Sequence, residues 1–139
     1  MPTDAAAIAK KTKLAKAERP AVLDGGPGGL SDSLTAALGS PVADRLAGKH
    51  DWIMMFAADK AALEAQLAGV AEALDSPGTL WIAYPKGSSK RQTDLTRDQG
   101  WEALKDVDLM WLSLISIDED WSAFSLRKYG PGEARQTFR

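Results

Sequence analysis

The fold is decided by residues 79–97, which read TLWIAYPKGSSKRQTDLTR. The first six residues form a bulky apolar run without polar alternation, which is typical of a strand covered on both faces of a parallel sheet. Pro85 ends this run because proline cannot donate to a strand ladder. A polar loop follows, and the capping-box pattern of residues 96–99 predicts that a helix begins near Thr96. The stretch therefore predicts a strand, a basic loop and a helix N-terminus in succession.

The flanking sequence repeats this alternation of strands and helices. A second apolar run, WIMMFA at residues 52–57, predicts another strand buried on both faces. Asp59 is expected to cap a helix whose apolar stripe extends to Leu74. The other expected elements are a strand over 20–24, a helix over 32–38, a helix over 97–105, and strands over 110–117 and 121–127.

Strands that alternate with helices imply parallel pairing through right-handed crossovers. The last two strands are close enough in sequence to form a hairpin, which adds an antiparallel member. The predicted fold is therefore α/β, a three-layer sandwich around a sheet of about five strands, mostly parallel, with a C-terminal antiparallel hairpin. We expect residues 1–19 to form a mobile basic arm or helix, 20–128 a single α/β domain, and 129–139 a polar tail.

Composition narrows the class of protein. The formal net charge is −2, but the first 20 residues carry +3, so the remaining 119 carry −5. An acidic body with a short basic arm argues against a nucleic-acid partner. No apolar run has the length of a membrane span, and the N-terminus lacks the apolar core of a secretory signal. Cysteine is absent, so thiolate chemistry is excluded and a cytoplasmic location is expected.

The basic loop is the first candidate site. It follows the carboxyl end of a predicted parallel strand, where open α/β sheets bind ligands, and it leads into a predicted helix N-terminus that favours anions. The alternative interpretation is a solvated loop in which Arg97 pairs with Asp94 or Asp98. The residues predicted to bind an anion are Lys86, Ser88, Ser89, Lys90, Arg91, Thr96 and Arg97.

The glycine-rich turn after residues 20–24 is the second candidate site. The segment VLDGGPG, residues 22–28, resembles the first motif of the class I S-adenosylmethionine-dependent methyltransferases. The resemblance implies that Gly26 and Gly28 let the backbone approach the cofactor while Asp24 orients it; the alternative is a turn that only needs positive φ. The sequence departs from the family because only about 28 residues separate Asp24 from the strand at Trp52. The family has two further strand–helix units there, including the acidic residue that holds the cofactor ribose.

A second resemblance covers most of the chain from about Lys13. Residues 80–86, 93–98 and 120–123 are similar to a family of short bacterial proteins classed as a domain of unknown function. This resemblance implies a compact methyltransferase-like fold and no established activity.

These observations lead to one leading hypothesis and two others. The leading hypothesis is a non-catalytic module that binds a small anion or a protein partner without a cofactor or metal, because His50 is the only histidine and no serine elbow is present. The alternative is a reduced methyltransferase-like enzyme or S-adenosylmethionine binder. The third hypothesis is a homodimer that forms through an exposed edge of the last strand.

Overall fold

The computed structural model describes residues 5–23, 30–39, 42–43, 45–86, 94–96, 100–107, 109–117, 120–129 and 132. Its elements, with η denoting a 3₁₀ helix, are α1 (Ala5–Lys11), η1 (Leu14–Lys16), β1 (Pro20–Val22), α2 (Leu30–Leu38), β2 (His50–Phe56), α3 (Lys60–Ala73), β3 (Leu74–Pro85), η2 (Glu102–Val107), β4 (Leu109–Ser116) and β5 (Trp121–Lys128).

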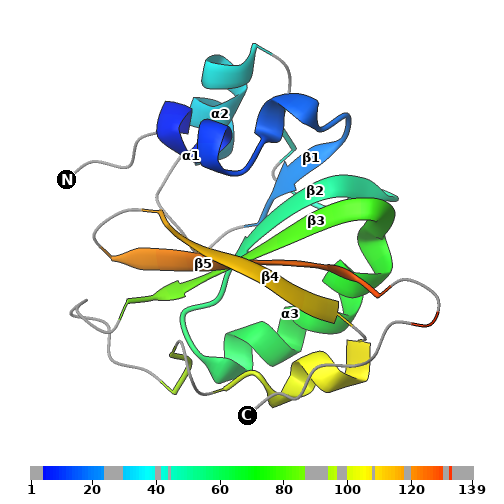
Figure 1. Ribbon diagram of the computed structural model, residues 1–139. Coiled ribbons are helices and arrows are strands. Elements are labelled where there is room, and N and C mark those ends of the chain that lie inside the picture. The colour runs from blue at the N-terminus through cyan, green and yellow to red at the C-terminus, as the bar shows by residue number, and fades with distance from the viewer. Residues whose placement is uncertain are drawn as a thin grey trace.

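The strands form a five-stranded sheet in the order β1-β2-β3-β5-β4. The pairs β1–β2 and β2–β3 are parallel, and β5 is antiparallel to both β3 and β4. Four strands therefore run in one direction and only β5 runs against them. Helices α1 and α2 lie on one side of the sheet, and α3 and η2 lie on the other (Figure 1). The predicted three-layer α/β sandwich with a C-terminal antiparallel hairpin is confirmed.

The centre of the sheet is the parallel pair of β2 and β3. In its register Ile53 lies beside Leu80, Met54 beside Trp81, and Met55 beside Ile82. All residues from Trp52 to Phe56 are at most 2% exposed. The two apolar runs lack polar alternation because helices cover both faces of this pair.

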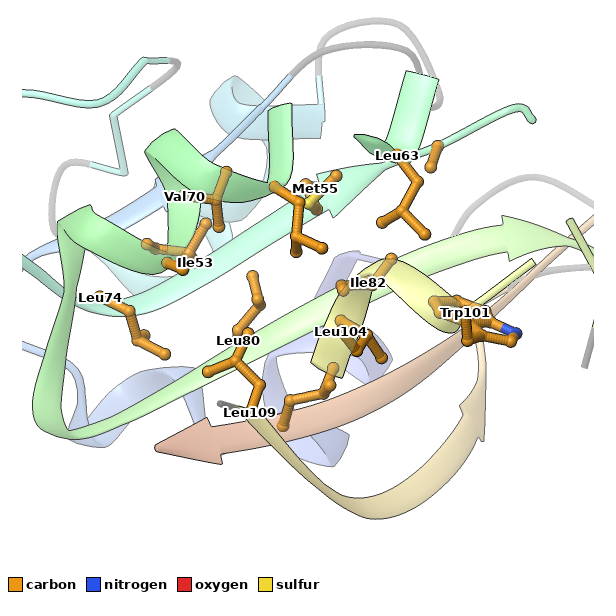
Figure 2. Packing of buried hydrophobic residues seen from close by; sticks show 14 of the residues in the cluster. Ile53, Met55, Leu63, Val70, Leu74, Leu80, Ile82, Trp101, Leu104 and Leu109 are labelled. Atoms are coloured by element: carbon orange, nitrogen blue, oxygen red, sulfur yellow. The ribbon is translucent and has the colours of Figure 1, made fainter. Parts of the chain in front are cut away.

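Side chains alternate between two apolar cores along these strands. Trp52, Met54 and Phe56 pack with Ile8, Leu14 and Leu34 on the side of α1 and α2. On the other side, the side chains of β2 and β3 face α3 and η2 (Figure 2). The residues of this second core shown there include Ile53, Met55, Leu63, Val70, Leu80, Ile82 and Leu104. Burial of each large apolar side chain contributes roughly 1.5–3 kcal/mol, so both layers are needed.

The basic N-terminal segment is anchored more firmly than its composition indicates. It has only two large apolar residues, Ile8 and Leu14, but these are 1% and 0% exposed. The indole Nε1 of Trp52 donates to the carbonyl oxygen of Thr12 (3.2 Å), which fixes the chain just after α1. A lysine-rich segment can thus cover a sheet face, because a helix needs only one apolar stripe to do so.

The place of the last strand differs from the expectation. β5 lies inside the sheet between β3 and β4, so the open edge beyond it belongs to β4. Ser125 of β5 is buried, and its hydroxyl accepts from the backbone N–H of Ser113 (3.1 Å) and bonds to the Ser113 hydroxyl (2.8 Å). These bonds make burial of a polar side chain tolerable. A homodimer through the edge of the last strand is therefore not available.

The chain enters β3 through an irregular stretch. The register passes from His50 beside Leu74 to Trp52 beside Thr79, so β3 holds extra residues there. Gly78 sits in this stretch, and a Cβ on it would lie 2.6 Å from the carbonyl oxygen of Asp75. The bulge therefore depends on glycine. None of the helices in the described segments is both long and apolar enough to cross a bilayer.

Gly78→Ala is expected to lower the free energy of unfolding by about 1–3 kcal/mol, because backbone must move to admit the methyl group. The matched control is Gly69→Ala in α3, where an added Cβ meets nothing within 4 Å. That change should raise stability by about 0.5–1 kcal/mol through helix propensity. Urea unfolding of both variants tests the pair; equal stability in the two would contradict the proposed clash.

Candidate functional site

The carboxyl ends of β1, β2 and β3 meet at one edge of the sheet. The backbone N–H of Leu23 donates to the carbonyl of Met54 (2.7 Å), and that of Ala57 donates to Ala83 (2.9 Å). Each strand is thus held by its neighbour up to its last residue. In the sequence the glycine-rich segment follows β1; Asp24, Gly26 and Gly28 lie outside the described residues, so their role stays a prediction.

In the part of the chain that the structure describes, one residue extends the sheet beyond β1. Ala43 forms an isolated parallel bridge with Ala21, in which Ala43 N–H donates to the Pro20 carbonyl (3.0 Å) and Val22 N–H donates to the Ala43 carbonyl (2.8 Å). Ala43 lies on the side of β1 opposite β2. This bridge occupies the position where the methyltransferase resemblance calls for further strands.

The N-terminus of α3 lies at the same edge, and two of its backbone donors are bound by carboxylates. The Asp59 carboxylate accepts from Ala62 N–H (2.8 Å), which confirms the predicted cap. The Asp94 carboxylate accepts from Lys60 N–H (2.8 Å). These two carboxylates complement the positive end of the helix, so an external anion at this helix start would have to compete with them.

The helix expected to begin at Thr96 is not present in that form. Gly100 has a φ of 97°, which a right-handed helix cannot contain, and η2 begins only at Glu102. Trp101 explains the difference: its ring is fully buried against Tyr84 and Phe124, and its indole N–H donates to the Thr96 carbonyl (2.6 Å). Gly100 lets the chain enter this packing, because an added Cβ there would lie 2.8 Å from the carbonyl oxygen of Asp94.

The predicted anion-binding residues are only partly covered by the structure. Lys86 is tied to the closing hairpin: its ammonium donates to the Ser116 hydroxyl (2.7 Å), and its backbone N–H donates to the Asp120 carbonyl (2.9 Å). Lys86 and Thr96 thus contact different parts of the molecule. The remaining candidates lie outside the described residues, so their role stays a prediction: Ser88, Ser89, Lys90, Arg91 and Arg97.

His50 has a structural role at the opposite edge of the sheet. Its Nε2 accepts from Ala47 N–H (2.9 Å), and its Nδ1 lies 2.9 Å from the Arg19 carbonyl. Both ring nitrogens are therefore used in holding the backbone around the start of β2, with the proton on Nδ1. Tyr84 and Trp121, which lie near strand ends, are buried in aromatic packing.

A cavity of about 450 Å³ lies on the α1 side of the sheet. Sequence reasoning missed it because its walls come from five separate parts of the chain. The residues that line it are Lys11, Thr12, Lys13, Lys16, Ala17, Asp51, Trp52, Gly78, Thr79, Trp81, Leu112, Ser113 and Ser125.

Comparison with known proteins identifies the class of fold. No protein-family model and no curated protein matches the sequence. Solved structures do match. The structure of mitomycin 7-O-methyltransferase MmcR matches with a TM-score of 0.68 and 11% identity, over 90% of this chain and 53% of that one. An S-adenosylmethionine-dependent methyltransferase from Clostridium acetobutylicum matches with a TM-score of 0.58 and 10% identity, over 91% of each chain. The glycopeptide N-methyltransferase MtfA, complexed with sinefungin, matches with a TM-score of 0.58 and 12% identity, over 93% of this chain and 88% of that one.

The chain therefore has the Rossmann-like fold of the class I methyltransferases, and it spans about half the length of MmcR. The preference for a non-catalytic module without a cofactor was wrong, because the solved structures that share this fold are consistently methyltransferases. The matches favour the alternative interpretation, an S-adenosylmethionine-dependent protein. The resemblance to the short bacterial family stays a prediction.

Asp94→Ala is expected to lower the free energy of unfolding by about 1 kcal/mol, since Lys60 N–H loses its acceptor. Asp94→Asn keeps an acceptor oxygen and should retain most of that stability. Thermal unfolding of the two variants separates a capping role from a general effect of charge. Equal losses in both would show that charge rather than the hydrogen bond stabilises the helix start.

Proposed function

We propose that the protein is a reduced S-adenosylmethionine-dependent methyltransferase whose cofactor binds at the carboxyl edge of β1 and β2. The observation that carries the proposal is the strand order β1-β2-β3-β5-β4 with β5 alone reversed. It occurs in a fold that matches several methyltransferases. In open α/β sheets the ligand lies beyond the carboxyl ends of the strands, and here a glycine-rich turn follows β1.

The residue types of the glycine-rich segment suit the binding of the methyl donor. Gly26 and Gly28 carry no Cβ, so a turn built on them admits close approach of a ligand. Asp24 supplies a carboxylate for a cationic or hydrogen-bond-donating group. When bound, S-adenosylmethionine supplies an activated methyl group for transfer to a nucleophilic atom of a second substrate. The proposed task of these residues is to hold and orient that donor.

The fold provides fewer elements beside β1 that could contact the ribose of the cofactor. In place of the family's additional strands the structure has the single bridge at Ala43. Asp44 follows Ala43 in the sequence, and we assign it as the carboxylate that accepts from the ribose hydroxyls. The resemblance implies an acidic residue for this role, and Asp44 is the acidic residue that follows Ala43 in the sequence.

Gly26→Val should abolish detectable binding of S-adenosylmethionine, because an isopropyl group fills the space that the ligand needs. Asp24→Asn should weaken binding about tenfold, as expected for loss of a charged hydrogen-bond acceptor. Isothermal titration calorimetry with S-adenosylmethionine and S-adenosylhomocysteine measures both. Gly69→Val on the exposed side of α3 is the control and should bind as the parent does. No heat from the parent at millimolar cofactor would refute the proposal.

Asp44→Asn tests the assignment of the ribose side separately. It should weaken S-adenosylhomocysteine binding about tenfold, since a hydrogen bond to a charged group is worth about 1.5–3 kcal/mol. Methionine lacks the ribose, so competition by methionine should be the same in the variant and the parent. Asp32→Asn, which removes an exposed charge from α2, is the matched control. An effect of equal size in both variants would indicate nonspecific electrostatics.

A further inference from the structure

The outer edge of β4 is open in the part of the chain that the structure describes. β4 is the last strand of the sheet, and β5 pairs with its inner edge. The backbone N–H of Ser113 donates to the Ser125 hydroxyl (3.1 Å), and that of Ile117 donates to the Trp121 carbonyl (2.9 Å). Because the bonding direction alternates along an antiparallel strand, Leu114 directs its N–H and C=O away from β5, toward the open edge.

This edge also carries apolar side chains. Among the described residues, the large hydrophobic side chains that are exposed are those of Leu112 (50%) and Leu114 (43%). Leu112 lies on the α1 side of the sheet, where it lines the same cavity as Trp81. Leu114 pairs with Phe124 and therefore lies on the side of α3 and η2. The edge is thus apolar on both of its faces.

The devices that normally protect a sheet edge cover only part of this one. Natural edge strands are protected by charged residues, by proline or by bulges. Residues 109–117 read LMWLSLISI and contain neither a charge nor a proline. The register shifts at Leu112, and the Lys11 ammonium donates to the Ser116 carbonyl (3.0 Å). Between these two points the backbone of Leu114 is available to another strand.

Charge complementarity decides which kind of strand fits this edge. Three exposed lysines, Lys11, Lys13 and Lys16, line the cavity to which Leu112 also contributes. Side chains of an added strand alternate between the two faces of the sheet. Those on the α1 side lie near the three ammonium groups, so carboxylates suit these positions. Those on the other side meet Leu114, so apolar side chains suit them.

A second copy of this chain fits the edge less well. Antiparallel pairing about a two-fold axis at Leu114 would place the lysines of both copies on the same side of the joined sheets. Residues 109–117 contain no carboxylate to offset them. The pairing would also be short, because the bulge at Leu112 and the Lys11 contact at Ser116 limit it, whereas stable interfaces bury roughly 1,200–2,000 Å².

We propose that β4 binds an extended acidic segment of a partner protein as an added antiparallel strand. Acidic residues of that segment lie on the α1 side, and apolar residues lie on the side of Leu114. Main-chain hydrogen bonds to Leu114 provide affinity, and the alternation of side chains provides selectivity. β4 and β1 are opposite margins of the sheet, so this inference does not depend on the cofactor site proposed beside β1.

The probe is an acetylated and amidated heptapeptide that alternates glutamate and valine, titrated into the full chain by calorimetry. One counterpart has lysine in place of every glutamate, and another carries N-methyl groups on its valines. The parent should bind the glutamate peptide about tenfold more tightly than the lysine peptide, because only the former complements the lysines. The N-methylated peptide should bind about tenfold more weakly, because its valines no longer donate to β4.

Leu114→Pro tests the edge directly, because it removes the outward N–H. It should weaken binding of the glutamate peptide about tenfold and leave the thermal midpoint near that of the parent, since an edge strand tolerates proline where the N–H faces solvent. Ile115→Pro is the structural control and should lower the thermal midpoint, because the N–H of Ile115 faces β5. Leu114→Thr keeps the strand and its N–H, so it should fold as the parent does and weaken binding about threefold through the lost apolar contact.

The lysines are tested by Lys13→Gln combined with Lys16→Gln, which should reduce the preference for the glutamate peptide about threefold. Lys10→Gln is the matched control, since Lys10 is an exposed lysine of α1 that does not line the cavity. That variant should show the same preference as the parent.

Three results overturn the proposal: no heat from the glutamate peptide at millimolar concentration, equal binding of the three peptides, or parent-like binding by Leu114→Thr together with folded Leu114→Pro. Sedimentation equilibrium of the parent and of Leu114→Pro supplies a fourth. A parent dimer that the proline variant dissociates would assign the edge to a second copy of this chain and also overturn the proposal.

Discussion

Two-sided burial of the β2–β3 pair is the constraint on which the rest of the structure depends. Successive side chains of a strand point to opposite faces, so an uninterrupted apolar run must find apolar cover above and below the sheet. Helix α3 and η2 provide it on one side, with Leu63, Leu67 and Leu104 fully or almost fully buried. On the other face of the sheet, α1 and η1 provide part of the cover, with Ile8 and Leu14 packed against the apolar side chains of β2 and β3.

The short connection between β1 and β2 shapes both the sheet and the candidate site. It contributes α2 and the bridge at Ala43, whereas the resemblance to methyltransferases calls for two further strand–helix units. Among the described residues, Ala43 alone pairs with the outer edge of β1. The strands β2, β3, β5 and β4 form the rest of the sheet and carry most of its buried residues. The apolar centre of the fold therefore does not depend on the part of the chain that is shortened.

The sequence predicted the structure correctly where the local pattern and the tertiary burial favour the same conformation. The runs at residues 52–57 and 79–84 identified the central strands, and Asp59 identified the start of α3 by its capping chemistry. Prediction from the sequence was wrong where tertiary packing overrides a local pattern. The capping-box pattern at Thr96 did not predict the conformation correctly, because Gly100 has a positive φ and Trp101 beside it is fully buried. Ser125 is polar, yet a hydrogen bond to Ser113, twelve residues away, satisfies its hydroxyl in the interior.

The cavity could not be predicted from a sequence motif, because its lining residues come from five separate parts of the chain. The lysines of residues 10–16 look like a solvated basic arm until Ile8 and Leu14 bind that arm to the sheet. The same packing that buries Trp52 then places Lys13 and Lys16 in the lining of a cavity that Trp81 also lines. Two features of this region lower the stability of the fold, the left-handed backbone at Lys13 and the buried, unpaired N–H of Trp81. Together they cost roughly 2–5 kcal/mol. Because folded domains are stable by only about 5–15 kcal/mol, burial of the apolar side chains on this side of the sheet must offset both costs.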